Sequence, residues 1–89
     1  MEFEWSEEKR LRTLAERGID FGEARRLFDG RPLFTYPSTR RDEARFVSVE
    51  LLDGRFIVAV WVERGLARRI ISMRRARDGE KGSYRTLYG

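Results

Sequence analysis

Residues 45–63 read RFVSVELLDGRFIVAVWVE. Two runs rich in β-branched and aromatic residues flank Asp53-Gly54, and this dipeptide between such runs is the strongest short-range signal of a β-hairpin. A two-residue turn there fixes which residues of the strands 45–52 and 55–63 lie opposite each other. The opposed pairs would be Val49 with Val58 and Val47 with Val60 on one face, and Phe46 with Trp61 on the other, beside Ser48 and Ala59. The stretch therefore predicts an antiparallel hairpin at the centre of the fold.

A short strand and a helix are predicted before the hairpin. Residues 2–5 alternate between polar and apolar side chains, as in a strand with one buried face. Ser6 is a favourable N-cap, and carboxylates follow it in the first turn. A helix is therefore expected from there to about Arg17, with Gly18 closing it. The apolar stripe that should face the core consists of Leu11, Leu14 and Ala15.

The next residues predict a second helix and a brief strand. Asp20 and Glu23 have the spacing of a capping box, so a helix should begin there and end near residues 29–30. Residues 33–36 follow as a strand, which flanking prolines keep short or at a sheet edge. The polar residues 37–44 are expected to form an exposed loop.

The residues after the hairpin predict one more strand and a short helix. Arg64-Gly65 marks a turn, residues 67–73 form the strand, and a helical turn or two begins at Asp78 after the chain leaves the sheet over residues 73–77. The turn admits more than one register, and a one-residue slip would exchange the faces of the last strand. The order of elements predicts one α+β domain over residues 1–89, with a short N-terminal strand and two helices packed on an antiparallel sheet, then a short C-terminal helix.

The composition excludes several kinds of chemistry. The 89 residues include no Cys and no His, which excludes thiolate metal sites, disulfides and any mechanism that depends on a thiol or an imidazole. Nineteen Lys and Arg against fifteen Asp and Glu give a net charge of +4, so a polyanionic or acidic partner is expected. No run approaches the ~18–20 apolar residues of a membrane span and no secretory signal is apparent, so the expected location is the cytoplasm.

Basic residues concentrate in the last third of the chain. The planar guanidinium group of Arg donates paired hydrogen bonds to phosphate, and aromatic side chains can stack on bases. Two interpretations stay open from charge alone, a solvated basic surface or a nucleic-acid-binding face, and aromatic residues in strands are more often part of the core. The basic residues are Arg64, Arg68, Arg69, Arg74, Arg75, Arg77, Lys81 and Arg85, and the aromatic ones Phe46, Trp61, Tyr84 and Tyr88.

A hydrolase with paired carboxylates is the less favoured alternative. Neighbouring acids occur at Glu7-Glu8, Asp42-Glu43, Asp78 and Glu80, where such pairs usually serve a helix dipole or solubility. The sequence has no loop of converging oxygen ligands for a hard cation and no glycine-rich phosphate loop. Neither a metal nor a cofactor is therefore expected.

One set of motifs runs through nearly the whole chain, from Glu2 to about Tyr84. It comprises Phe3-Glu4-Trp5, Gly18-Ile19-Asp20-Phe21, Glu23-Ala24, Phe28-Asp29, Asp53-Gly54-Arg55, Glu63-Arg64-Gly65 and Arg69-Ile70-Ile71-Ser72-Met73-Arg74-Arg75-Ala76. In this order and spacing, the motifs resemble the BrnT toxins of bacterial type II toxin–antitoxin pairs. The chain departs from that family's pattern at Ser6, where Asp is common, at Arg17, where His is common, and at Arg77, where Ser or Thr is usual.

The resemblance implies a RelE-like ribonuclease fold and an RNA-cleaving toxin that inhibits translation. It also implies a hetero-oligomer with a cognate ribbon-helix-helix antitoxin, similar to BrnA, which represses the shared operon, so that DNA is contacted only through the antitoxin. An alternative is a non-catalytic antitoxin-binding or nucleic-acid-binding module of the same fold.

A ribonuclease of this kind, working without a metal, needs cations at the phosphate and groups that transfer protons. On that basis the candidates for phosphate or transition-state contacts are Arg64, Arg69, Arg74 and Arg75. The candidates for proton transfer are Lys81 and Tyr84, with Glu63 as a base.

Overall fold

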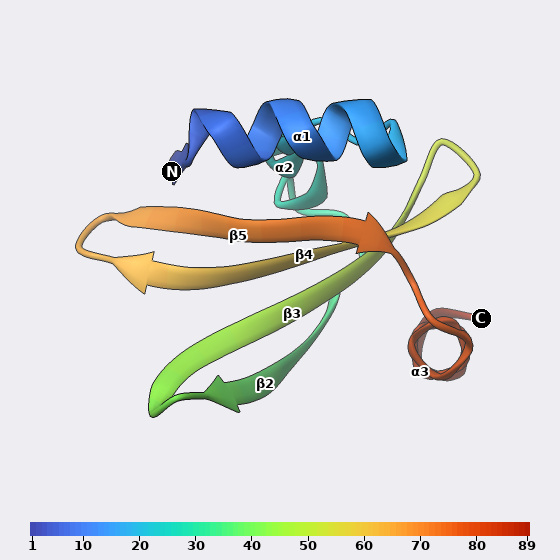
Figure 1. Cartoon of the computed structure of the whole chain (residues 1–89). Coiled ribbons are helices and arrows are strands. Elements are labelled where there is room, and N and C mark those ends of the chain that lie inside the picture. The colour runs from blue at the N-terminus through green and yellow to red at the C-terminus, as the bar shows by residue number, and fades with distance from the viewer.

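The computed structural model describes all 89 residues, and a five-stranded mixed sheet lies at its centre (Figure 1). The strands follow the order β1-β5-β4-β3-β2 across the sheet. Their bounds are β1 Glu2–Trp5, β2 Phe34–Arg40, β3 Glu43–Leu52, β4 Arg55–Arg64 and β5 Ala67–Arg75. Strands β2 to β5 form an antiparallel meander, whereas β1 pairs with β5 in parallel. The α+β class is confirmed. The expectation of an antiparallel sheet is wrong at one edge, because β1 and its neighbour β5 run in the same direction.

The central hairpin has the predicted register. Strands β3 and β4 place Val49 opposite Val58 and Phe46 opposite Trp61, and the other two predicted pairs also form. The turn residues Asp53 and Gly54 have φ values of 51° and 79°, the positive values that a tight type I′ hairpin turn requires.

Replacing Gly54 by Ala should destabilise the chain by about 1–2 kcal/mol, because a Cβ is disfavoured in the left-handed region. The matched control is Gly82→Ala, in the interior of helix α3 (Asp78–Tyr88), where an added Cβ meets no atom within 4 Å. That change should stabilise by up to about 1 kcal/mol. Urea denaturation measures both. A Gly54→Ala protein as stable as wild type would contradict the turn assignment.

Helix α1 (Glu7–Arg17) has the predicted ends but not the predicted buried face. The Ser6 hydroxyl accepts a hydrogen bond from the Lys9 N–H at 3.3 Å, and Gly18 ends the helix with a φ of 67°. No residue of α1 is buried, and Leu11 and Leu14 are 53% and 40% exposed. The expected burial of this stripe is wrong because the segment after α1 fills the space against the sheet instead. It does so with Ile19, Phe21, Ala24 and Leu27, which pack on Leu52, Ile57, Ala59, Trp61, Ile70 and Met73.

The second helix is shorter than predicted. It consists of a 3₁₀ turn, η1 (Phe21–Glu23), followed by α2 (Ala24–Leu27). The Asp20 carboxylate accepts a hydrogen bond from the Gly22 N–H at 2.9 Å, whereas Glu23 pairs with Arg26 at 3.0 Å. Asp20 therefore caps the segment through Gly22, but the reciprocal bond from Glu23 that would complete the expected capping box does not form.

Two elements extend beyond their predicted limits. Strand β2 continues through Pro37 to Arg40, and a two-residue turn at Arg41-Asp42, with φ values of 52° and 63°, connects it to β3. The expected loop over residues 37–44 is therefore wrong, since an edge strand tolerates a proline that a central strand excludes. Strand β5 likewise continues to Arg75, and α3 is an eleven-residue helix rather than one or two turns.

The helices cover the two faces of the sheet unequally. Figure 1 shows α1 and α2 on one side and α3 on the other, near one end of the strands. Under α3 lies a second, smaller cluster built on Val47, Val49 and Val58. The rest of the α3 face has no helix over it, and this face carries the candidate site. None of the three helices is both long and apolar enough to span a bilayer.

Candidate nucleic-acid interface

A groove of about 330 Å³ lies on the uncovered part of the α3 face. We call it the basic groove. Strands β2 to β5 and the residue before α3 form it, and its charged lining consists of four arginines with no acidic side chain. The lining residues are Tyr36, Ser38, Arg40, Arg45, Val47, Val60, Ile71, Ser72, Arg74 and Arg77.

Strand periodicity and one bulge place these side chains together. Residues two apart on a strand share a face, so β2 contributes Tyr36, Ser38 and Arg40. In β5 the ladder shifts register between Val60 and Trp61 of β4, and the neighbouring residues Ile71 and Ser72 both line the groove. A bulge of this kind re-aims side chains next to a site. The bulge also determines that the Arg74 side chain lies on the face of β5 that lines the groove.

Arg74 is held at the groove by a buried carboxylate. Its guanidinium makes two hydrogen bonds to Glu80 of α3, from Nη1 to Oε1 at 2.7 Å and from Nη2 to Oε2 at 2.9 Å. The Tyr36 hydroxyl donates to Oε2 of Glu80 at 2.5 Å, and the Arg77 N–H donates to Oε1 at 2.8 Å. Glu80 is only 8% exposed. These four hydrogen bonds join β2, β5 and the start of α3.

The network shifts the pKa values of its members in opposite directions. Burial alone would raise the pKa of Glu80, but the hydrogen bonds from Arg74, the Arg77 N–H and Tyr36 outweigh it and lower the pKa to about 2. Hydrogen bonding to Glu80 raises the pKa of Arg74. Burial, with the adjoining carboxylate of Glu80, raises the pKa of Tyr36. At neutral pH the site therefore contains an ionised Glu80 and a protonated Tyr36.

The arginines of the groove differ in how strongly they are neutralised. Arg40 and Arg77 have no carboxylate within ion-pair distance, and Arg45 pairs with the half-exposed Glu43 at 2.9 Å. Exposed pairs of this kind contribute little and separate easily. Arg74 is paired with Glu80, but a guanidinium has five N–H donors, so further donors remain for a ligand.

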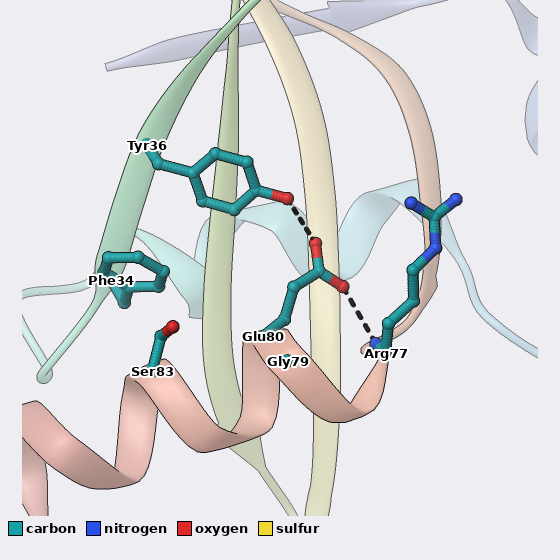
Figure 2. Close-up of a pocket in the computed structure, with 6 residues that line it drawn as sticks. All are labelled: Phe34, Tyr36, Arg77, Gly79, Glu80 and Ser83. Atoms are coloured by element: carbon teal, nitrogen blue, oxygen red, sulfur yellow. Dashed lines mark hydrogen bonds between the residues drawn. The ribbon is translucent and has the colours of Figure 1, made fainter.

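A second hollow of about 510 Å³ adjoins the basic groove (Figure 2). The two share Tyr36 and Arg77. We call the second hollow the aromatic pocket. Its lining residues are Phe34, Tyr36, Arg77, Gly79, Glu80 and Ser83.

Of the residues predicted for the site, Arg74 lines the groove and the others on β4 and β5 do not. Arg75 pairs across the sheet with Ile57 and, as the neighbour of Arg74 on the strand, faces the other side. Arg69 lies 3.8 Å from the carboxylate of Glu4 on β1. Glu63 and Arg64 are exposed at the end of β4.

The two predicted residues of α3 also lie outside both hollows. Tyr84 packs edge-on against Phe56 at a ring-centroid distance of 5.5 Å and donates a hydrogen bond to the Pro32 carbonyl at 3.3 Å. Lys81 is half-buried on the helix and lines neither the basic groove nor the aromatic pocket. The helix presents Glu80 to the site instead.

The sequence did not predict three residues of the site: Tyr36, Arg40 and Arg45. Arg77 was predicted only as part of the basic cluster, and Glu80 only as one of a pair of acids with Asp78. A period-two signal was present on β2, where Tyr36, Ser38 and Arg40 alternate with other residues. The pattern was overlooked because Pro37 was expected to end the strand and begin a loop. The role of Glu80 had no sequence signal, because it depends on β5 and α3 meeting in space.

Arg17, one of the positions at which the chain departs from the pattern that it resembles, does not line the groove. Arg17 ends α1 on the other face of the sheet and donates a hydrogen bond to the Met73 carbonyl at 2.8 Å. This departure therefore removes no side chain from the groove.

One buried carboxylate lies outside the site. Glu50 of β3 is fully buried, its two carboxylate oxygens make no hydrogen bond, and its nearest cation is Arg31, with Nε at 3.6 Å from Oε1. It lies on the sheet face opposite Val47 and the groove. Burial raises the pKa of Glu50 to about 7.

Replacing Glu50 by Gln should therefore remove a pH dependence of stability. The folded chain holds a proton on Glu50 up to a pKa of about 7, whereas an exposed glutamate releases it near 4.5. The free energy of unfolding of the wild type should fall as pH rises through this window. The Gln variant, which cannot ionise, should be the more stable protein above it. Urea denaturation at both ends of the window measures the difference, and parallel curves for the two proteins would contradict the assignment.

No group of three or more His, Cys, Asp or Glu side chains is arranged to hold a metal ion. The family model described as "Ribonuclease toxin, BrnT, of type II toxin-antitoxin system" matches residues 5–80 of the chain. The matched span contains every residue that lines the basic groove. A search of curated proteins gave no match.

Proposed function

Because the chain belongs to the BrnT family of ribonuclease toxins of type II toxin–antitoxin systems, we propose that it cleaves RNA in the basic groove without a metal ion. The observation that supports this location is the convergence of Arg40, Arg45, Arg74 and Arg77 with no acidic residue in the lining. Guanidinium groups bind phosphate through two parallel hydrogen bonds. The groove thus offers several positions for the backbone of one RNA strand.

In the proposed reaction the ribose 2′-oxygen attacks the adjacent phosphorus and the bond from phosphorus to the 5′-oxygen breaks. The products are a 2′,3′-cyclic phosphate and a 5′-hydroxyl. Negative charge develops on the phosphoryl oxygens during the attack, and preorganised cations stabilise it best where reorganisation is small. Arg74 fits this role because Glu80 fixes its guanidinium in two hydrogen bonds.

We assign proton donation to the 5′-oxygen to Tyr36, whose hydroxyl must first exchange its hydrogen bond to Glu80 for one to that oxygen. The raised pKa of Tyr36 keeps the hydroxyl protonated at neutral pH, and the Arg74 guanidinium partly offsets the repulsion between Glu80 and the phenolate that remains. The 2′-hydroxyl proton passes to solvent, and solvent then returns a proton to Tyr36. Glu80, with a pKa of about 2, is too weak a base to take part and acts as a positioning residue for Arg74 and Tyr36.

The test is incubation of the purified chain with RNA in the presence of a chelator, followed by analysis of the new ends. We expect 2′,3′-cyclic phosphate or 3′-phosphate ends and 5′-hydroxyl ends. An Arg74→Ala protein prepared in parallel controls for contaminating nucleases. Cleavage that requires added metal, or products with 3′-hydroxyl ends, would overturn the mechanism.

A non-catalytic RNA-binding module is the second candidate. The observation that favours it is the lack of an imidazole or a free carboxylate in the groove lining to accept the 2′-hydroxyl proton. This alternative predicts binding without new ends, with an affinity that falls as salt rises by a slope of about 0.7 for each phosphate contacted. The chelator experiment distinguishes the two.

Membership of a type II toxin family implies a cognate protein antitoxin. We propose that this antitoxin is a BrnA-like ribbon-helix-helix protein, that it covers the basic groove in a hetero-oligomer, and that DNA is bound only through it. Inhibition of translation, a RelE-like fold and a cytoplasmic location also stay predictions. Protection of the groove arginines from chemical modification in the co-purified complex, but not in the free chain, would support the covered-groove arrangement.

A further inference from the structure

The aromatic pocket continues the basic groove but has a different character. Its walls include the rings of Phe34 and Tyr36, whose centroids lie 5.5 Å apart at an interplanar angle of 32°. Figure 2 shows the Glu80 carboxylate hydrogen-bonded to the Tyr36 hydroxyl and the Arg77 backbone nitrogen, with Phe34 and Ser83 lining the other side of the pocket. The polar atoms of Tyr36 and Glu80 are thus already paired with each other. The Ser83 hydroxyl lies beside the Phe34 ring.

The helix contributes open space to this pocket. Gly79 lies in the first turn of α3, and a Cβ added there would meet no atom within 4 Å. The volume of about 510 Å³ is within the range of about 300–1,000 Å³ typical of small-molecule sites. A flat ligand with an apolar face and a polar edge suits aromatic walls and a single free hydroxyl.

We propose that the aromatic pocket binds one nucleobase of a single-stranded RNA whose phosphates lie in the basic groove. This inference rests on the proposed function for the identity of the ligand. The two shared residues, Tyr36 and Arg77, place an aromatic surface directly beside a phosphate-binding one, as a base lies beside its own backbone. A base in a duplex is stacked and paired, so only an unpaired base can enter. The pocket thus makes the presence of an unpaired base at one position a determinant of binding.

The experiment compares two short 2′-O-methyl oligonucleotides of equal length, one with bases and one abasic. Neither has the attacking hydroxyl, so binding is measured whether or not the chain cleaves RNA. The wild type should prefer the base-containing oligonucleotide by about 5- to 100-fold, the range expected for stacking of one base on aromatic side chains. Equal affinity for the two would overturn the proposal even if ordinary RNA is cleaved.

The test variant is Gly79→Leu, which fills the pocket without removing any contact, and its control is Gly82→Leu on the same helix. An added Cβ at Gly82 also meets no atom within 4 Å, but this glycine does not line the pocket. Gly79→Leu should bind both oligonucleotides alike, and Gly82→Leu should keep the wild-type preference. A preference that survives in Gly79→Leu would overturn the proposal.

The outcomes also separate this inference from the proposed function. A base preference in a chain that leaves ordinary RNA intact would support the pocket and contradict the nuclease. Arg40→Ala should weaken binding of both oligonucleotides by the same factor, since Arg40 lines the basic groove but not the aromatic pocket. Failure of the wild type to bind either one would overturn the pocket proposal, whereas the proposed cleavage is judged separately by the ends that ordinary RNA acquires.

Discussion

Replacing Arg74 by Ala should lower the rate of RNA cleavage by about 10²–10³-fold, the loss typical of removing one preorganised donor to a developing anion. Arg74 is the arginine of the groove whose position a buried carboxylate fixes, with its side chain 19% exposed. Lys in its place should not restore activity, because an ammonium cannot keep the two parallel hydrogen bonds to Glu80. Because Arg74→Ala also leaves the buried Glu80 without its cation, cleavage of a fluorogenic RNA in the presence of a chelator is compared on protein that urea denaturation shows to be folded.

The neighbouring residue is the matched control. Arg75→Ala removes the same charge one position along β5, but its side chain is exposed and on the opposite face, so cleavage should stay close to the wild-type rate. Arg77→Ala breaks no ion pair and should reduce cleavage without a large loss of stability. Equal losses in Arg74→Ala and Arg75→Ala would show that net charge, rather than the groove, determines activity.

Replacing Glu80 by Ala should destabilise the chain by about 3–5 kcal/mol, since removal of one partner leaves the other charge of a buried pair uncompensated. Arg74 would lose two hydrogen bonds, and the Tyr36 hydroxyl and the Arg77 N–H one each. A domain of this size has a total stability of about 5–15 kcal/mol. The variant should therefore be close to unfolding, as urea denaturation will show.

The same carboxylate should make the fold sensitive to acid. The pKa of Glu80 is lowered from 4.5 to about 2 in the folded chain, so its contribution is complete above 4.5 and is lost as pH falls through that window. Glu43→Ala, which breaks the exposed pair with Arg45, should cost less than about 1 kcal/mol. A Glu80→Ala protein no less stable than Glu43→Ala would contradict the buried network.

The parts of the fold that follow from local chemistry were predictable. Asp53-Gly54 defines a turn and hence a register, and Ser6 and Gly18 define both ends of α1. The burial of α1 was not predictable, because a stripe at helical spacing does not tell which neighbouring segment reaches the sheet first. Here Phe21, four residues after the end of α1 at Arg17, is fully buried while Leu11 stays exposed.

The candidate site depends on contacts that are distant in sequence. Tyr36 and Glu80 are separated by 44 residues along the chain, and no pattern in the sequence links them. The position of Arg74 in the groove depends on the register shift beside Trp61, which alternation in β5 does not reveal. Charge density in the last third of the chain indicated Arg74 and Arg77 as basic residues but not which face each occupies.

Pro37 has a consequence for self-association. Strand β2 is one edge of the sheet, and open edges are templates on which further chains add and aggregate. Pro37 has no N–H to offer to such a strand, and the opposite edge, β1, is only four residues long. Both edges are therefore poor templates, so the chain is protected from edge-to-edge polymerisation even when no other protein covers it.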